Sequence, residues 1–179
     1  MGNYKVESDF MHNGLRCVVV FTSMGHRCGY VGIDKEHPLF GKYYSSKCLK
    51  MADIEDQPIG KRGIIPIFCA GENESELVSP DLYFDVHGSI TFSGGNPSDY
   101  PVKSALWWFG FDCAHAGDES DYKQAFDYGI LSEDRLNALQ SYRSCLGGVH
   151  RSKEYVESEC KSLADQLKKL TEDDGQCSD

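Results

Sequence analysis

The sequence lacks any apolar run long enough to cross a membrane. The run at Cys17–Phe21 is five residues long, whereas a membrane-spanning helix needs about 20. The first ten residues, Met1–Phe10, contain no apolar stretch of the kind that signal peptides carry. We therefore expect a cytoplasmic protein that does not associate with membranes.

Basic charge is also scarce. Lys and Arg number 18 against 28 Asp and Glu, which gives a net charge of −10. Phosphate backbones and anionic lipids repel such a surface, so general nucleic-acid binding is excluded. Motifs that mark large enzyme classes are missing as well: the sequence has no Gly-x-Ser-x-Gly, no phosphate-binding P-loop and no His-Glu-x-x-His.

What the chain does contain fits one globular domain over residues 1–179. A length of 179 residues with 40% hydrophobic and 12% aromatic residues is enough to bury a core. We find no linker that would divide the chain, and we expect residues 171–179 to form a flexible acidic tail. Because we see no export signal, we expect the eight cysteines to be reduced thiols rather than a disulfide framework. None of them form a Cys-x-x-Cys pair.

The pattern of the chain predicts an α+β fold, with a mainly antiparallel mixed sheet covered by a long C-terminal amphipathic helix. The sequence predicts a hairpin formed by Leu15–Ser23 and Cys28–Ile33, because both segments are rich in apolar and β-branched residues and flank a turn. Further strands are predicted at Ile64–Cys69, Leu82–Ser93 and Ala105–Cys113, and a helix at Leu131–Tyr142.

The C-terminal helix is the best-defined element of the sequence. Apolar side chains recur at spacings of four, three, four and three, which places them on one helical face. They are Val156, Cys160, Leu163, Leu167 and Leu170. Ser152 is positioned to cap the helix, and the apolar face predicts packing against the sheet.

The predicted strand Leu82–Ser93 has an unusual polar face. Residues two apart share a face of a strand, and here one face holds short polar groups around one imidazole: Asp85, His87, Ser89, Thr91 and Ser93. Asp85 would lie beside His87 and orient its ring. A solvated sheet face is the alternative, but such faces usually carry Lys or Glu, which are missing here.

The next predicted strand brings two tryptophans. Trp107 and Trp108 fall on opposite faces, so both cannot enter the same core, and we expect one of them to line a pocket or an interface. A turn at Gly117-Asp118 would bring Asp112, His115 and Asp118 to the mouth of this strand.

Two further sites remain open. A tetrahedral zinc ion would suit two pairs, His26 with Cys28 and Cys113 with His115. Buried free thiols are the usual alternative. A cation that prefers oxygen ligands would suit the carboxylates of Asp112, Asp118 and Asp121. Arg27 sits in a basic, Gly-flanked turn and would bind a phosphate or carboxylate through two hydrogen bonds, unless it is a solvent-exposed turn residue.

Several short segments of the sequence together resemble a known family. They are Gly29–Ile33 with His37–Leu39, Asp85–Gly88, Trp107–Asp118, Glu154–Val156 and Glu159–Cys160. From about Gly14 to Leu170 the chain resembles a largely unannotated family of small proteins from tailed phages and prophages. The resemblance implies a phage protein in the cytoplasm of an infected bacterium, and by analogy an anti-defence protein that sequesters a nucleotide-derived immune signal.

The residues and the resemblance together lead to three hypotheses. We favour a binding protein that holds a nucleotide-like molecule, without a cofactor. Its ligand-binding residues would be His26, Arg27, His87, Ser89, Thr91, Trp107, Trp108, Asp112 and His115. A hydrolase, a phosphodiesterase with His87, Asp85 and His115 as catalytic residues, is the first alternative. A protein–protein inhibitor of a host enzyme is the second. A bound divalent metal and a homo-oligomer both remain open.

Overall fold

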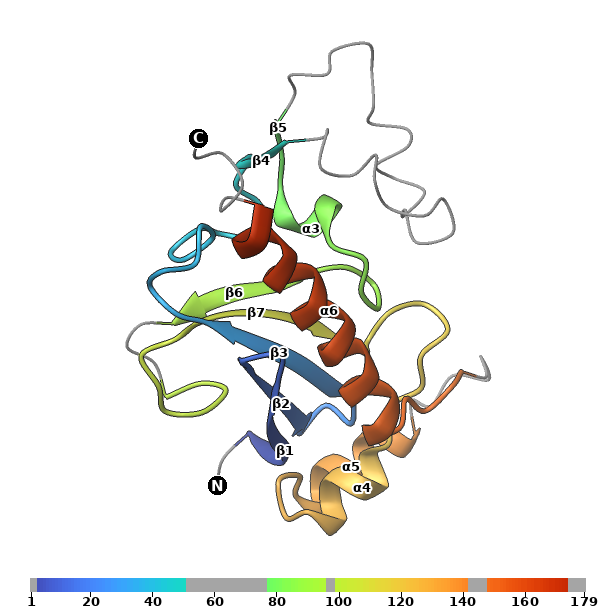
Figure 1. Cartoon of the computed structure of the whole chain (residues 1–179). Helices are drawn as coiled ribbons and strands as arrows, with labels where there is room; N and C mark the ends of the chain where they lie inside the picture. Colours follow the sequence, from blue (N-terminus) through green and yellow to red (C-terminus); the bar gives the residue numbers. More distant parts are fainter. Residues whose placement is uncertain (1–2, 51–76, 96–98, 142–147, 174–179) are drawn as a thin grey trace, which may run out of the picture.

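A five-stranded antiparallel sheet forms the centre of the molecule (Figure 1). The computed structural model describes residues 3–50, 77–95, 99–141 and 148–173. The strands are β1 (Tyr4–His12), β2 (Leu15–Thr22), β3 (Arg27–Ile33), β6 (Phe92–Gly95) and β7 (Trp107–Asp112). Their order in the sheet is β1-β2-β3-β7-β6, and every neighbouring pair is antiparallel.

The remaining elements surround this sheet (Figure 1). The short strands β4 (Leu49–Lys50) and β5 (Leu77–Val78) form a second, two-stranded sheet. The helices are α3 (Pro80–Tyr83), α4 (Tyr122–Asp127), α5 (Glu133–Ser141) and α6 (Lys153–Asp173). The prediction of an α+β fold is confirmed. In the described part of the chain, no helix combines the length and the apolar character that a membrane span requires.

The first three strands follow one another as hairpins. The predicted pairing of β2 with β3 is confirmed, and Gly25 supplies the positive φ of 80° at their turn. Strand β1 was not predicted, although Asn13-Gly14, with φ values of 49° and 82°, is a typical two-residue hairpin turn. The register of β1 shifts between Val6 and Ser8, which marks a bulge at Glu7.

Helix α6 covers one face of the sheet and lies mainly over β2 and β3 (Figure 1). The predicted apolar stripe is confirmed: Val156, Cys160, Leu163 and Leu167 are completely buried, and Leu170 is partly buried against the same core. Each buried Val or Leu side chain contributes about 1.5–3 kcal/mol by leaving water. The predicted cap is also confirmed, because the Tyr155 N–H donates to Ser152 Oγ at 3.2 Å. The predicted tail begins later than residue 171, because α6 continues to Asp173; residues 174–179 lie outside the described residues.

The two tryptophans lie on opposite faces of β7, as predicted. Trp107 belongs to the core between the sheet and α6, whereas Trp108 packs with Val18, Val20 and Tyr30 on the other face. Their exposed fractions are 9% and 0%. Each indole N–H is satisfied internally, since Trp107 donates to the Lys42 carbonyl at 2.9 Å and Trp108 to Ser104 Oγ at 3.0 Å.

The predicted strand Leu82–Ser93 is wrong over most of its length. Pro80–Tyr83 forms α3, the chain is irregular as far as Thr91, and only β6 is extended. Gly88 and Ser89 have positive φ values of 70° and 115°, which end the two-residue alternation of an extended strand. Three apolar side chains that suggested a strand, Phe84, Val86 and Ile90, are nevertheless buried. The alternation of apolar and polar residues in this segment therefore comes from a buried loop and not from a strand. The predicted strand Ile64–Cys69 lies outside the described residues.

Candidate functional site

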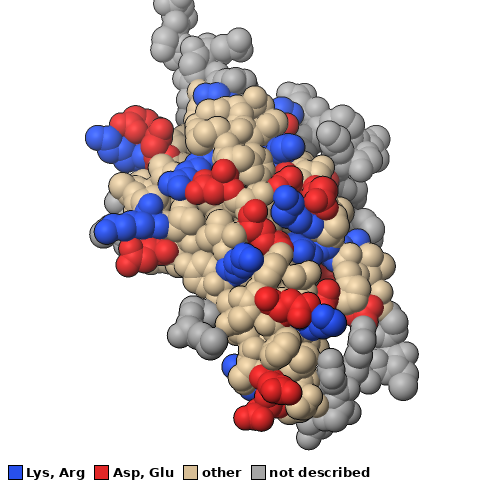
Figure 2. All heavy atoms as spheres, turned by 90° about the horizontal axis from the view of Figure 1, so that it is seen from below, with Lys and Arg blue, Asp and Glu red and all other residues tan. Residues whose placement is uncertain are grey.

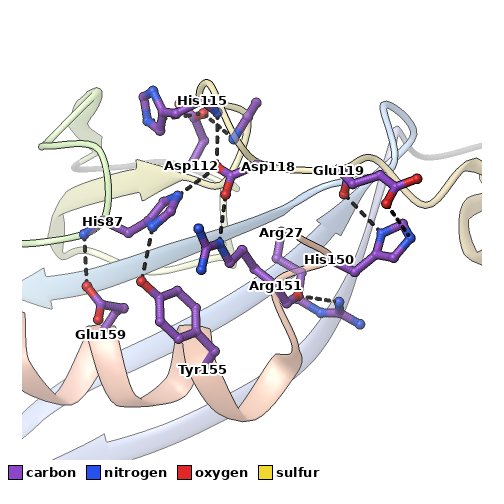
Figure 3. A network of polar contacts seen from close by, with 11 residues as sticks. Arg27, His87, Asp112, His115, Asp118, Glu119, His150, Arg151, Tyr155 and Glu159 are labelled. Carbon is purple, nitrogen blue, oxygen red and sulfur yellow. Dashed lines mark hydrogen bonds and ion pairs between the residues drawn. The ribbon is translucent and has the colours of Figure 1, made fainter. Parts of the chain in front are cut away.

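Loops from distant parts of the chain meet at the N-terminal end of α6 (Figure 3). The loop at 84–91 follows α3, the turn at 24–27 joins β2 to β3, and residues 113–121 follow β7. Residues 148–151 join them, because Val149 forms a parallel bridge with Asp118. Most of the polar groups predicted from the sequence lie in these loops.

Asp118 is the centre of the polar network. Its Oδ1 accepts a hydrogen bond from Arg151 Nε at 2.7 Å, and its Oδ2 accepts from His87 Nε2 at 2.7 Å and from the His115 backbone N–H at 3.0 Å. Only 2% of the side chain is exposed. Burial by itself would raise the pKa of this carboxyl, but the bonds from Arg151, His87 and His115 outweigh it and lower the pKa below 3.8. Asp118 is therefore an ionised, fully hydrogen-bonded carboxylate.

The imidazole of His87 is held on both sides. Because an ionised carboxylate only accepts, Nε2 donates to Asp118, and in the neutral ring Nδ1 accepts from the Tyr155 hydroxyl at 3.0 Å. The His87 backbone N–H donates to Glu159 Oε2 at 2.8 Å. Burial and the neighbouring Glu159 raise the pKa of Tyr155, so this phenol keeps its proton.

A tight turn places Asp118 in this position. The Asp118 N–H donates to the His115 carbonyl at 3.0 Å, and Gly117 has a φ of 92°. Gly148 allows the second loop to approach, because a Cβ there would lie 2.8 Å from the Asp118 backbone. The predicted turn at Gly117-Asp118 is confirmed, and it brings Asp118 close to His115.

Four of the predicted site residues gather beside this network. Thr91 Oγ1 donates to Asp112 Oδ2 at 2.8 Å, His115 Nε2 lies 3.7 Å from Asp112 Oδ1, and the His87 and His115 ring centroids are 5.7 Å apart. His115 Nε2 is buried and has no hydrogen-bond partner among the described residues. Gly88 packs directly against this ring, and a Cβ at that position would overlap it.

A small depression lies on the other side of Arg151. It is lined by Gly25, His26, Arg27, Cys113, Glu119, Asp121, His150 and Arg151. Its empty volume of about 210 Å³ includes the part open to solvent, so the depression is shallow and does not enclose a ligand. A small group such as a phosphate would therefore contact the lining residues from the solvent side.

Other predicted site residues lie elsewhere or have other partners. The carboxylate on the His87 ring is Asp118 and not Asp85, whose side chain is exposed and whose backbone bonds to Gln166 of α6. The expectation that one tryptophan lines a pocket is wrong, because Trp107 and Trp108 are both core residues. Ser89 is half-buried in the irregular loop, where the strand alternation that placed it beside His87 does not hold.

Arg27 lines the depression but is committed to internal partners. Its Nε and Nη2 donate to the two carboxylate oxygens of Glu7 at 2.6 and 3.0 Å, and Nη1 donates to the Arg151 carbonyl at 2.7 Å. The Glu7 side chain is 4% exposed, and Tyr128 also donates to it at 2.7 Å. The two-point contact predicted for Arg27 with a ligand is thus made with the protein's own bulged strand β1.

The four residues considered for zinc do not converge. Cys28 lies in the core cluster on the Trp108 face of the sheet, whereas Cys113 lies in the cluster beneath α6. Burial raises the pKa of each thiol to about 12, so both are neutral thiols. Within the described ranges, no group of three His, Cys, Asp or Glu side chains is placed to hold a metal ion.

Several residues of the site were not predicted. Tyr155 and Glu159 are four apart on α6 and border its apolar stripe, so their helical spacing was a usable signal. His150 and Arg151 precede the Ser152 cap, and nothing in the sequence apart from their charge indicated that they belong to the site.

Comparison of the chain with protein-family models, with curated proteins and with solved structures finds no match.

Proposed function

We propose that this protein binds a small phosphate-bearing molecule of the nucleotide-derived class and holds it intact. The observation that carries the proposal is the depression in which His26, His150 and Arg151 meet beside a rigid buried network. The resemblance to phage proteins supports a biological role for such binding, namely sequestration of a bacterial immune signal inside the infected cell.

The depression offers an anion hydrogen-bonding groups and no excess of positive charge. Two guanidinium groups and two imidazoles line it, and both carboxylates have internal partners. Asp121 caps α4 by accepting from the Gln124 N–H at 2.9 Å, and Glu119 Oε2 lies 3.5 Å from His150 Nε2. Figure 2 shows positive and negative side chains intermingled on the face seen from below. Attraction of an anion to this acidic protein would therefore depend on local contacts.

The state of His87 favours binding over cleavage. A general base must reach the proton that it removes, directly or through one water. His87 has both ring nitrogens in hydrogen bonds, and its side chain is 11% exposed. Tyr155 keeps its proton because its pKa is raised, so it is not an activated nucleophile. The network suits a scaffold that holds Arg151 in place.

The size of the depression limits what it can hold. Because its empty volume of about 210 Å³ includes open solvent, a phosphate would bind at the mouth of the depression and a whole nucleotide would not be enclosed. The base and sugar of the ligand would then lie on the surface outside the depression.

The proposal is tested by native mass spectrometry with cyclic AMP and a set of cyclic dinucleotides as probes. We expect a complex with at least one probe, and we expect the same probe to be recovered intact after the complex is denatured. Recovery of cleaved product alone would favour the phosphodiesterase alternative. The absence of any complex over the whole set would refute the proposal for these nucleotide classes.

Two substitutions by glutamate test the location. The His150 side chain is 45% exposed, so His150→Glu should fold normally and place a negative charge at the depression. We expect it to weaken probe binding at least tenfold. Lys35→Glu is the matched control, because Lys35 is 80% exposed and lies outside the depression; equal effects of the two changes would contradict the assigned site.

A further inference from the structure

The fixed charges that line the depression cancel. Arg27 and Arg151 contribute two positive charges, and Glu119 and Asp121 contribute two negative charges. Two buried carboxylates lie directly behind the guanidinium groups, since Glu7 pairs with Arg27 and Asp118 with Arg151. With both imidazoles neutral, two positive and four negative groups leave the depression and its first neighbours with a net charge of −2, which disfavours an anion.

His26 and His150 are the groups that can change this balance. His150 Nδ1 must donate to the Glu119 carbonyl at 3.0 Å, because a carbonyl oxygen only accepts. Its Nε2 lies 3.5 Å from Glu119 Oε2, so a positively charged His150 ring would form an ion pair with that carboxylate. The other charged groups at the depression are Asp121, Arg27 and Arg151.

His26 is half-buried at the turn between β2 and β3. Burial lowers its pKa, and the positive form of His115 acts in the same direction, while Asp112, Asp118 and a hydrogen bond to the Met24 backbone oppose the change. The ring is therefore neutral in the empty protein near pH 7. An anion placed against it would offset the cost of burial and favour its protonated form.

We propose that the anion binds at the mouth of the depression together with one or two protons, which are taken up by His26 and His150, so that binding strengthens as the pH falls. This inference rests on the proposed function and adds its regulation. The protein would hold its ligand most tightly in a slightly acidic cell and release it as the pH rises. Each fully linked proton changes the affinity by about tenfold per pH unit.

Isothermal titration calorimetry with a bound probe tests the coupling. Cyclic AMP and sulfate are suitable probes, because neither changes its charge between about pH 6 and about pH 8. Titrations in two buffers of different ionisation enthalpy then report how many protons the protein takes up. We expect binding of at least one probe to be ten- to a hundredfold tighter at about pH 6 than at about pH 8, with net proton uptake.

Variants assign the protons to their residues. In the double variant His26→Gln/His150→Gln we expect weak binding that no longer depends on pH. His12→Gln is the matched control, because His12 pairs with Asp165 at the far end of α6, outside the depression, and it should keep the full pH dependence.

The outcomes separate this inference from the proposed function. Equal affinity at both pH values, or a pH dependence that survives in the double variant, would overturn the coupling and leave the proposed function standing. Failure of the wild-type protein to bind either probe at either pH would count against the proposed function itself, and the coupling would fall with it.

Discussion

The ring of His87 donates from Nε2 to the carboxylate of Asp118, 31 residues later in the chain, at 2.7 Å. This bond joins the loop after α3 to the turn after β7. Through Arg151 and Tyr155 the same two residues are tied to the start of α6. A change in either residue should therefore affect the stability of three segments at once.

Replacing Asp118 by Asn tests how much the network contributes to the free energy of unfolding. The change removes the charge that Arg151 and His87 share, and we expect the free energy of unfolding to fall by about 2–3 kcal/mol. Because the pKa of Asp118 is lowered below 3.8, its contribution is complete above that pH and disappears as the pH falls through the lowered value. Urea unfolding between about pH 7 and about pH 2 should show a smaller acid loss in the variant.

The control for this change is Asp9→Asn. Asp9 pairs with Arg16 on the surface, and the two side chains are 37% and 34% exposed. Such pairs contribute about 0–1 kcal/mol. If Asp9→Asn cost as much as Asp118→Asn, the network would have no special role.

Tyr155→Phe tests the tautomer of His87. The variant leaves Nδ1 of a mostly buried imidazole without its donor, and we expect a loss of about 1–2 kcal/mol. NMR of the ring nitrogens should show Nε2 protonated in the wild type. Tyr43→Phe should be nearly neutral, because that side chain is 60% exposed. A wild-type ring protonated only at Nδ1 would contradict the assigned hydrogen bonds.

Gly88→Ala tests the packing against His115. A Cβ at Gly88 would overlap the imidazole, and the φ of 70° is unfavourable for alanine. We expect thermal unfolding to report a loss of about 2–4 kcal/mol. Gly117→Ala separates strain from overlap, since Gly117 has a φ of 92° with no atom within 4 Å of the added Cβ. It should cost only about 1 kcal/mol, and equal losses would argue against the overlap.

His37→Gln tests a second buried histidine. His37 is 5% exposed; its Nδ1 accepts from the Leu39 N–H and its Nε2 donates to the Leu167 carbonyl. Burial lowers its pKa below 6.5, so folding favours the neutral ring. Its contribution is present above that pH and disappears as the pH falls through the lowered value.

The wild type should therefore lose stability between about pH 7 and about pH 5, and His37→Gln should lose less over the same range. The variant should also be about 1–3 kcal/mol less stable near pH 7, because a buried backbone group loses its partner. His12→Gln replaces a more exposed ring and should keep the wild-type slope. An unchanged slope in His37→Gln would show that the loss arises elsewhere.

The sequence by itself determined the elements that have a local pattern. The β2–β3 hairpin, the strand around Trp107–Asp112 and the stripe from Val156 to Leu167 were predicted, because a strand or helix repeats its buried positions at a fixed interval. The same rule failed at Leu82–Ser93, where Phe84, Val86 and Ile90 are buried without forming a strand.

Only the tertiary structure decided the partners within the site. The sequence pointed to His87, Asp112, His115 and Asp118, but it paired His87 with Asp85, its neighbour in the chain. The structure pairs that ring with Asp118 and with Tyr155, 68 residues away. The first bond depends on how the loops after α3 and β7 meet and the second on where α6 lies on the sheet, and no local repeat encodes either.

The surroundings of Arg27 and the tryptophans were decided in the same way. Arg27 reads in the sequence as a basic turn residue, yet the bulge in β1 gives it Glu7 as a buried partner. Trp107 and Trp108 were assigned correctly to opposite faces, but the sequence did not show that the second face is also covered. The covering side chains come from Tyr100, Val102 and Leu106, and their position depends on the path of a loop between two paired strands.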